Sequence, residues 1–330
     1  MSVGAWCWSA IIAAVAASVL LPIEAGAAGS LSDVFKGSSD KGSPKHSKSS
    51  SQAPKQASAK HATSRHAGSA KRDEAPKPQN VRLAALGPAN LNLNPGSSTC
   101  EPAKFRIAVD VGHTAESEGA SSARNVPEFA FNLRLARQIE EKLKAEGFAQ
   151  TRLLVTEGKA KPSLFKRVAV ANDWHANLFL SIHHDSVPDK LLEDWEFDGK
   201  KSHFSDRFGG YSVFVSRNNA DFKTSLAFAE LVAREMKAKG LQYAQQYTMP
   251  IMGHYQHPLL NKETGVYSYD QLVVLRKTDM PAVLLEAGSI INRDEELKMD
   301  SPERRDIVSS AVLAATKNFC GLPEPFLGPL

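Results

Sequence analysis

Apolar and polar residues recur along residues 105–318 with two different periods, which predict strands and helices in turn. Short β-branched and aliphatic runs predict strands at 105–111, 151–156, 177–183, 211–216, 271–276 and 282–287. Apolar residues at helical spacing predict helices at 126–146, 163–174, 221–239 and 302–318. Strands that alternate with helices are typical of three-layer α/β folds. We therefore predict a single domain with a mixed, largely parallel sheet flanked by helices.

The helix predicted at 126–146 is amphipathic. Its apolar positions follow helical spacing and comprise Phe129, Leu133, Ala136, Ile139 and Leu143. We expect Asn125 to cap this helix, Pro127 to lie in its first turn and Glu128 to stand at its start. Taken alone, Glu128 is best interpreted as a carboxylate that the helix dipole stabilises.

Three of the predicted strands run directly into a residue that can bind a metal or exchange a proton. These residues are His113, His183 and Glu286. In an open α/β sheet such groups collect in a crevice at the carboxyl ends of the strands. An ionised carboxylate inside a sheet needs a cation, a hydrogen-bond partner or a wet cleft. Two histidines and a carboxylate are also a common ligand set for catalytic zinc, with water in the remaining position.

A resemblance to a known family rests on five blocks of residues between about 104 and 320. The blocks are Asp110-x-Gly112-His113; Glu128 with Asn132-Leu133; Ser163-Leu164-x-x-Arg167 with Ala171-Asn172; Ser181-Ile182-His183; and Pro281 through Glu286 with Gly288 and Asn292. In this order and context the chain resembles the zinc-dependent N-acetylmuramoyl-L-alanine amidases, the family-3 type of cell-wall hydrolase.

The resemblance implies one zinc ion held by His113, Glu128 and His183, with Glu286 as the catalytic carboxylate. Glu286 would take a proton from water and return one to the departing amine. The implied substrate is peptidoglycan, cleaved at the amide between N-acetylmuramic acid and L-alanine. The sequence departs from the usual family pattern at Thr114, at His184-Asp185 and at Ser289. These departures affect the expected substrate fit and loop shape more than the expected zinc binding.

Two other functions remain open at this point. A zinc peptidase or deacetylase could use the same residues on another envelope amide. A noncatalytic wall-binding module would be expected to lack a ligand or the base, whereas all four residues are present here. Imidazole and carboxylate groups also suit divalent ions other than zinc.

The first 95 residues differ in composition from the rest of the chain. Residues 1–28 contain no Lys or Arg, and an apolar run is followed by Ala25-Gly26-Ala27, so we predict a signal peptide and export to the periplasm or cell envelope. An uncleaved membrane anchor is the alternative. Residues 29–95 are rich in Ser, Lys, Ala and Pro, which predicts a disordered linker before the catalytic domain at 96–330.

The positive charge of the chain belongs to this linker. Residues 29–95 carry 11 Lys and Arg against 4 Asp and Glu, so residues 96–330 have a net charge of −2 within the total of +4, Glu24 being the one charge in 1–28. A basic linker can be attracted to anionic lipid or envelope polymers, although it can equally be a spacer without a partner. Export argues against nucleic acid as a partner, and we expect a monomer.

Cys100 and Cys320 remain after removal of a signal peptide that contains Cys7. An even pair of cysteines in an exported chain predicts a disulfide between them.

Two intervals, 187–210 and 241–270, lack clear periodicity, and long loops of this kind are often functional. The first follows His183 and is rich in acidic residues, so one hypothesis makes it a lid that lends a carboxylate to the site; the alternative is an ordinary surface insertion. The second contains tyrosines that could line a substrate groove. As substrate-binding residues we select His254 and Arg276, although Arg276 could instead form a structural salt bridge.

Overall fold

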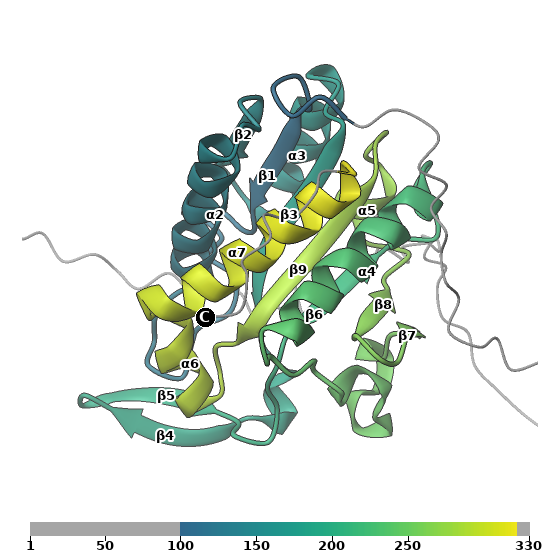
Figure 1. Cartoon of the computed structure of the whole chain (residues 1–330). Helices are drawn as coiled ribbons and strands as arrows, with labels where there is room; N and C mark the ends of the chain where they lie inside the picture. The colour runs from purple at the N-terminus through teal and green to yellow at the C-terminus, as the bar shows by residue number, and fades with distance from the viewer. Residues whose placement is uncertain (1–99, 322–330) are drawn as a thin grey trace, which may run out of the picture. The chain divides into compact units, whose positions relative to one another are not determined.

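The computed structural model describes residues 100–321 (Figure 1). The signal peptide predicted at 1–28 and the linker predicted at 29–95 lie outside these residues. The main elements are β1 (Ile107–Val111), α2 (Glu128–Ala145), β2 (Thr151–Leu154), α3 (Ala160–Asp173), β3 (Leu178–Asp185), β4 (Glu193–Phe197), β5 (Lys200–Phe204), β6 (Ser212–Val215), α4 (Phe222–Ala238), β7 (Leu259–Asn261), β8 (Val266–Ser268), α5 (Val273–Arg276), β9 (Ala282–Ser289), α6 (Arg293–Met299) and α7 (Pro302–Phe319).

A seven-stranded sheet runs through the centre in the order β2-β1-β3-β9-β6-β8-β7. The pairs β1–β2, β1–β3, β3–β9 and β6–β8 are parallel, whereas β6–β9 and β7–β8 are antiparallel. The predicted mixed, largely parallel sheet flanked by helices is therefore confirmed.

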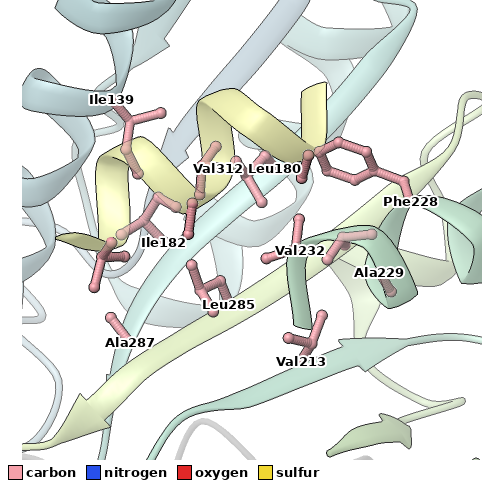
Figure 2. Packing of buried hydrophobic residues seen from close by; sticks show 14 of the residues in the cluster. Ile139, Leu180, Ile182, Val213, Phe228, Ala229, Val232, Leu285, Ala287 and Val312 are labelled. Carbon is pink, nitrogen blue, oxygen red and sulfur yellow. The ribbon is translucent and has the colours of Figure 1, made fainter. Parts of the chain in front are cut away.

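Alternation along the central strands sends every second side chain to each face of the sheet. The odd-numbered positions of β1 and β9 and the even-numbered positions of β3 pack against α2, α4 and α7, as Figure 2 shows for Leu285 and Val312. This face forms the larger hydrophobic core and is closed by residues such as Ile139, Phe228 and Val232.

The opposite face is covered by α3, α5 and the segment between α4 and β7. Its smaller core includes Ala108, Phe179 and Leu284. Along their strands these residues alternate with those of the larger core, so they point to the second face. Farther along the same strands, the same parity directs Asp110, His183 and Glu286 toward this second face. The polar residues predicted at the strand ends therefore share one side of the sheet.

The strand predicted at 271–276 is wrong. The structure has a short helix, α5, at Val273–Arg276, and two short strands, β7 and β8, in the interval that lacked periodicity. A strand after β8 has no place beside β9, because β9 is already flanked by β3 and β6. The chain instead crosses the sheet as α5 before it enters β9.

The start of α2 also differs from the prediction. Pro127 occupies the N-cap position and no side chain caps the helix, so Asn125 is not the N-cap. Asn125 instead has a φ of 62°, which Asn tolerates better than most residues, and lies in the turn before the helix. The buried stripe of α2 includes Phe131 and Leu135, whereas the predicted Phe129 and Leu133 are only partly buried.

The predicted disulfide between Cys100 and Cys320 is confirmed. It joins the segment before β1 to the residue that follows α7, across a sequence separation of 220 residues. Within residues 100–321, no helix is both long and apolar enough to span a membrane.

Candidate functional site

Three potential metal ligands converge on the second face of the sheet. His113 follows β1, Glu128 is the first residue of α2, and His183 lies near the end of β3. One ligand atom from each lies within 4.8 Å of the others. Oε2 of Glu128 is 2.9 Å from Nε2 of His113, and Oε1 is 3.0 Å from Nδ1 of His183. All three side chains that the resemblance implied as ligands are thus brought together.

Glu128 is held by hydrogen bonds in addition to these contacts. The backbone N–H groups of Ala120 and His184 and the side-chain amide of Asn132 all donate to its carboxylate, at 3.1 to 3.3 Å. Burial would raise the pKa of Glu128, but the neighbouring His113 and His183 outweigh burial and hold it well below its usual range. The carboxylate is therefore kept ionised in a buried position.

Two glycines make room for the three ligands. A Cβ on Gly112 would lie 2.4 Å from Nε2 of His183. A Cβ on Gly119 would lie 2.5 Å from Oε2 of Glu128, and the φ of Gly119 is +82°. A side chain at either position would occupy the space that the ligand atoms need.

Arg167 fixes the end of β1. Its buried guanidinium donates to the Asp110 carboxylate at 3.0 Å and to the carbonyls of Val111 and His113. Ser181 donates to the other oxygen of Asp110 at 2.7 Å. Arg167 therefore positions the backbone of His113 from α3.

Glu286 lies opposite His183 in the paired strands β9 and β3 and lines the same cavity. Among the described residues its Oε2 atom is buried without a hydrogen-bond partner. Burial raises the pKa of Glu286 well above its usual value, and the carboxylates of Asp185 and Glu128 raise it further. A buried carboxyl of this kind is suited to accept and return a proton.

Asp185 is a site residue that the sequence did not single out. Tyr247 donates to its carboxylate at 2.6 Å and Gln246 at 3.1 Å. Burial raises the pKa of Asp185 to about 7, against the opposing effect of the Tyr247 hydrogen bond. The preceding residue, His184, faces α2, and its Nδ1 donates to Oδ1 of Asn132 at 2.8 Å.

The cavity around these groups extends between α3 and the 241–270 segment. Its far wall is apolar and aromatic and is formed by Leu164, Phe214, Tyr247, Met252, Tyr255, His257, Tyr269 and Leu272. The proposed groove tyrosines therefore lie in the right region. His254 is exposed and Arg276 donates weakly to Gln271, and neither lines the cavity, which His257 does.

The 187–210 interval forms an antiparallel hairpin of β4 and β5. Val187 and Pro188 line the cavity, but no residue of the hairpin itself does so. Its acidic residues Glu193, Asp194 and Glu196 are exposed. The hairpin thus contributes no carboxylate to the site, contrary to the lid hypothesis.

The arrangement fits a divalent metal. Nε2 of His113 is buried and lies 2.9 Å from an oxygen of Glu128, yet it makes no hydrogen bond of acceptable geometry within the described part of the chain. Two imidazoles and one carboxylate with an adjacent cavity match the three-ligand sets of catalytic zinc sites, which keep one position open. Imidazole nitrogen favours zinc and the later transition metals over magnesium or calcium.

Comparison with known proteins agrees with this chemistry. A family model described as N-acetylmuramoyl-L-alanine amidase matches residues 107–318. A Buchnera aphidicola protein whose name assigns it as an N-acetylmuramoyl-L-alanine amidase is 23% identical over 219 residues, which cover 64% of this chain and 95% of the relative. The amidase AmiC of Escherichia coli is 24% identical over 238 residues, which cover 64% of this chain and 52% of AmiC. This chain therefore matches about half the length of AmiC.

The crystal structure of the N-acetylmuramyl-L-alanine amidase Ami1 from Mycobacterium smegmatis has a TM-score of 0.51 and 20% identity, and covers 68% of this chain and 99% of that one. At this identity the likeness shows a shared fold. The family match extends over most of the described residues and includes the three converging ligands and Glu286. On these grounds the chain belongs to the N-acetylmuramoyl-L-alanine amidase family.

Proposed function

We propose that this protein is an exported, zinc-dependent amidase that hydrolyses the bond between N-acetylmuramic acid and L-alanine in peptidoglycan. The observation that carries the proposal is the convergence of His113, Glu128 and His183 beside the buried carboxyl of Glu286. Family membership supports peptidoglycan as the substrate. Relatives are named N-acetylmuramoyl-L-alanine amidases, and a Staphylococcus saprophyticus relative is named a probable cell wall amidase, which supports action outside the cytoplasm.

His113, Glu128 and His183 would hold one zinc ion per chain. When bound, zinc lowers the pKa of water and polarises the scissile carbonyl. Asp110 and Arg167 would support the site from behind, because they fix the backbone that carries His113. Neither needs to contact the substrate for this purpose.

Glu286 would act as the proton carrier of the reaction. Its carboxylate accepts a proton from the attacking water, and the same proton then passes to the nitrogen of L-alanine as the amide bond breaks. The products are a glycan with a free lactyl carboxylate and a stem peptide with a free amino terminus. A substrate seated against the apolar and aromatic far wall of the cavity would displace water from the site of this proton transfer.

We also propose that the protein is exported to the periplasm or envelope and that it is a monomer. Its basic 29–95 segment would be attracted to anionic surfaces. The sequence of residues 1–95 supports the export and this attraction. Nucleic acid has no part in the proposal.

A combined metal and product analysis tests this function. The purified protein should contain about one equivalent of zinc by elemental mass spectrometry. With purified peptidoglycan it should release stem peptides that begin with free L-alanine, without new reducing sugar ends and without free acetate. Acetate release would instead indicate a deacetylase, cleavage inside the stem a peptidase, and wall binding without products a noncatalytic module.

A further inference from the structure

The segment that leads into α2 is a closed loop, which we call the ligand loop and define as residues 118–129. Its two arms are joined by backbone hydrogen bonds: Phe129 N–H donates to Glu118 at 2.9 Å, and Glu128 N–H donates to Ala120 at 2.8 Å. The N–H of Ala120 donates in turn to Oε2 of Glu128 at 3.2 Å. Ala120 therefore holds both the backbone and the carboxylate of Glu128.

The β4–β5 hairpin forms hydrogen bonds with the tip of the ligand loop, around Ala123. Nε1 of Trp195 and the hydroxyl of Ser202 both donate to the carbonyl of Ala123, each at 2.8 Å. The side-chain amide of Asn125 donates to the carbonyl of Lys201 at 3.2 Å. Three hydrogen bonds thus join the hairpin to a turn only a few residues from Glu128.

Arg124 attaches the same tip to α6 on the other side. Its guanidinium lies 5.7 Å from the ring centre of Trp195 and forms an ion pair with the buried carboxylate of Glu296. Its N–H donates to Glu296 at 3.0 Å and its side chain to the carbonyl of Arg293 at 2.9 Å. Figure 1 shows the hairpin beside α6, so the tip is held between the two elements.

The hairpin contributes no residue to the cavity, and the ligand loop connects it to Glu128. We propose that Trp195 and Ser202 are positioning residues for Glu128: by anchoring Ala123 they fix the ligand loop and, through Ala120, the carboxylate that binds the metal. The inference rests on the proposed metal-binding function. The 187–210 insertion would thus influence metal affinity, although no residue of its hairpin lines the cavity.

Affinity for zinc, measured with the full-length protein, tests this inference. The variants are Trp195→Phe, Ser202→Ala and the double variant, and the readout is the zinc Kd from competition with a chelator of known affinity. Each single variant leaves one hydrogen bond to the Ala123 carbonyl, so we expect a small loss. In the double variant we expect about tenfold weaker zinc binding, the lower end for residues that orient a metal ligand.

His203→Ala is the matched control, because His203 lies on the same hairpin and, within residues 100–321, pairs only with Asp194 across it, at 2.9 Å. It should leave the zinc Kd unchanged. A hairpin that merely stabilises the fold would lower the melting temperature of the double variant without changing the zinc Kd of the folded protein, and that result would overturn the inference. If the double variant does not fold, the folded Ser202→Ala protein decides: an unchanged Kd overturns the inference and a weaker one supports it.

The same measurements separate this inference from the proposed function. Wild-type protein that binds zinc and cleaves peptidoglycan, together with a double variant of unchanged Kd, would leave the function intact and refute the positioning role. Wild-type protein that binds no zinc would refute both. Zinc binding without amide cleavage would refute the assigned reaction, while the Kd comparison would still decide the part played by the hairpin.

Discussion

Glu286 and His183 are direct partners in the parallel ladder between β9 and β3. The pleat directs both side chains to the face of the sheet that carries the cavity, so a potential base and a potential metal ligand stand side by side. Two neighbouring strands thus set their separation, and no flexible loop intervenes. This rigid placement is what a proton transfer beside a metal requires.

Glu286→Gln should abolish most activity and leave metal binding intact. Glutamine has nearly the same shape as glutamate but cannot accept the proton from water, so we expect kcat to fall by about 10² to 10⁴. Ser212, the partner of Glu286 on β6, provides a control, since Ser212→Ala should retain activity. Steady-state kinetics and zinc content measure both effects. A glutamine variant with wild-type kcat would disprove the assignment.

Gly112→Ala should weaken metal binding. The added Cβ would meet the His183 ring at 2.4 Å, and the ring must move away from the other two ligands. We expect zinc affinity to fall at least tenfold, by the size of effects seen when ligand orientation is lost. Gly240→Ala is a suitable comparison, because its Cβ meets open space and only its φ of +82° costs about 1 kcal/mol of stability. Equal zinc affinities in the two variants would contradict this explanation.

The central strands could be predicted from sequence because they carry a strong and simple signal. Residues 105–111, 177–183 and 282–287 are apolar on both faces, as strands covered by helices on each side must be. The short strands β7 and β8 have three residues each, which is too few for alternation to be visible. The run at 271–276 shows the converse error, since apolar β-branched residues also suit a buried turn of helix.

His113 and His183 could be singled out as candidate ligands because each follows a recognisable strand, whereas Glu128 became a candidate only through the family resemblance. The contacts that support these ligands could not be predicted. Tyr247 and Asp185 are 62 residues apart, and Trp195 and Ala123 are 72 apart, and no local pattern indicates either pair. In the 241–270 segment, composition cannot decide which histidine faces the cavity: His257 lines it, whereas His254 is exposed.

Loss of the disulfide should lower stability substantially. The bond between Cys100 and Cys320 joins the two ends of the folded part, and closing a loop of 220 residues contributes about 5 kcal/mol in the chain-entropy model. Measured contributions are often smaller, so we expect a loss of about 2 to 5 kcal/mol in the Cys100→Ser/Cys320→Ser variant. Urea unfolding with and without reductant measures it. Equal unfolding free energies for oxidised wild type and the double variant would show that the cross-link contributes nothing.

Acid should destabilise the fold partly through His257. Burial among Phe214, Tyr247 and Tyr269 lowers the pKa of His257 to about 4, although Asp270 acts in the opposite direction. Its stabilising contribution is complete above the unfolded pKa of about 6.5 and is lost as the pH falls toward 4, because the unfolded chain takes up the proton first.

In a His257→Gln variant this loss is absent, since glutamine does not titrate. Between pH 7.5 and 4.5 the wild type should therefore lose roughly 2 to 3 kcal/mol more unfolding free energy than the variant. Urea unfolding of both proteins at several pH values measures the difference, and other titrating groups cancel because they are common to both. Parallel stability curves across this range would show that His257 is not buried in its neutral form.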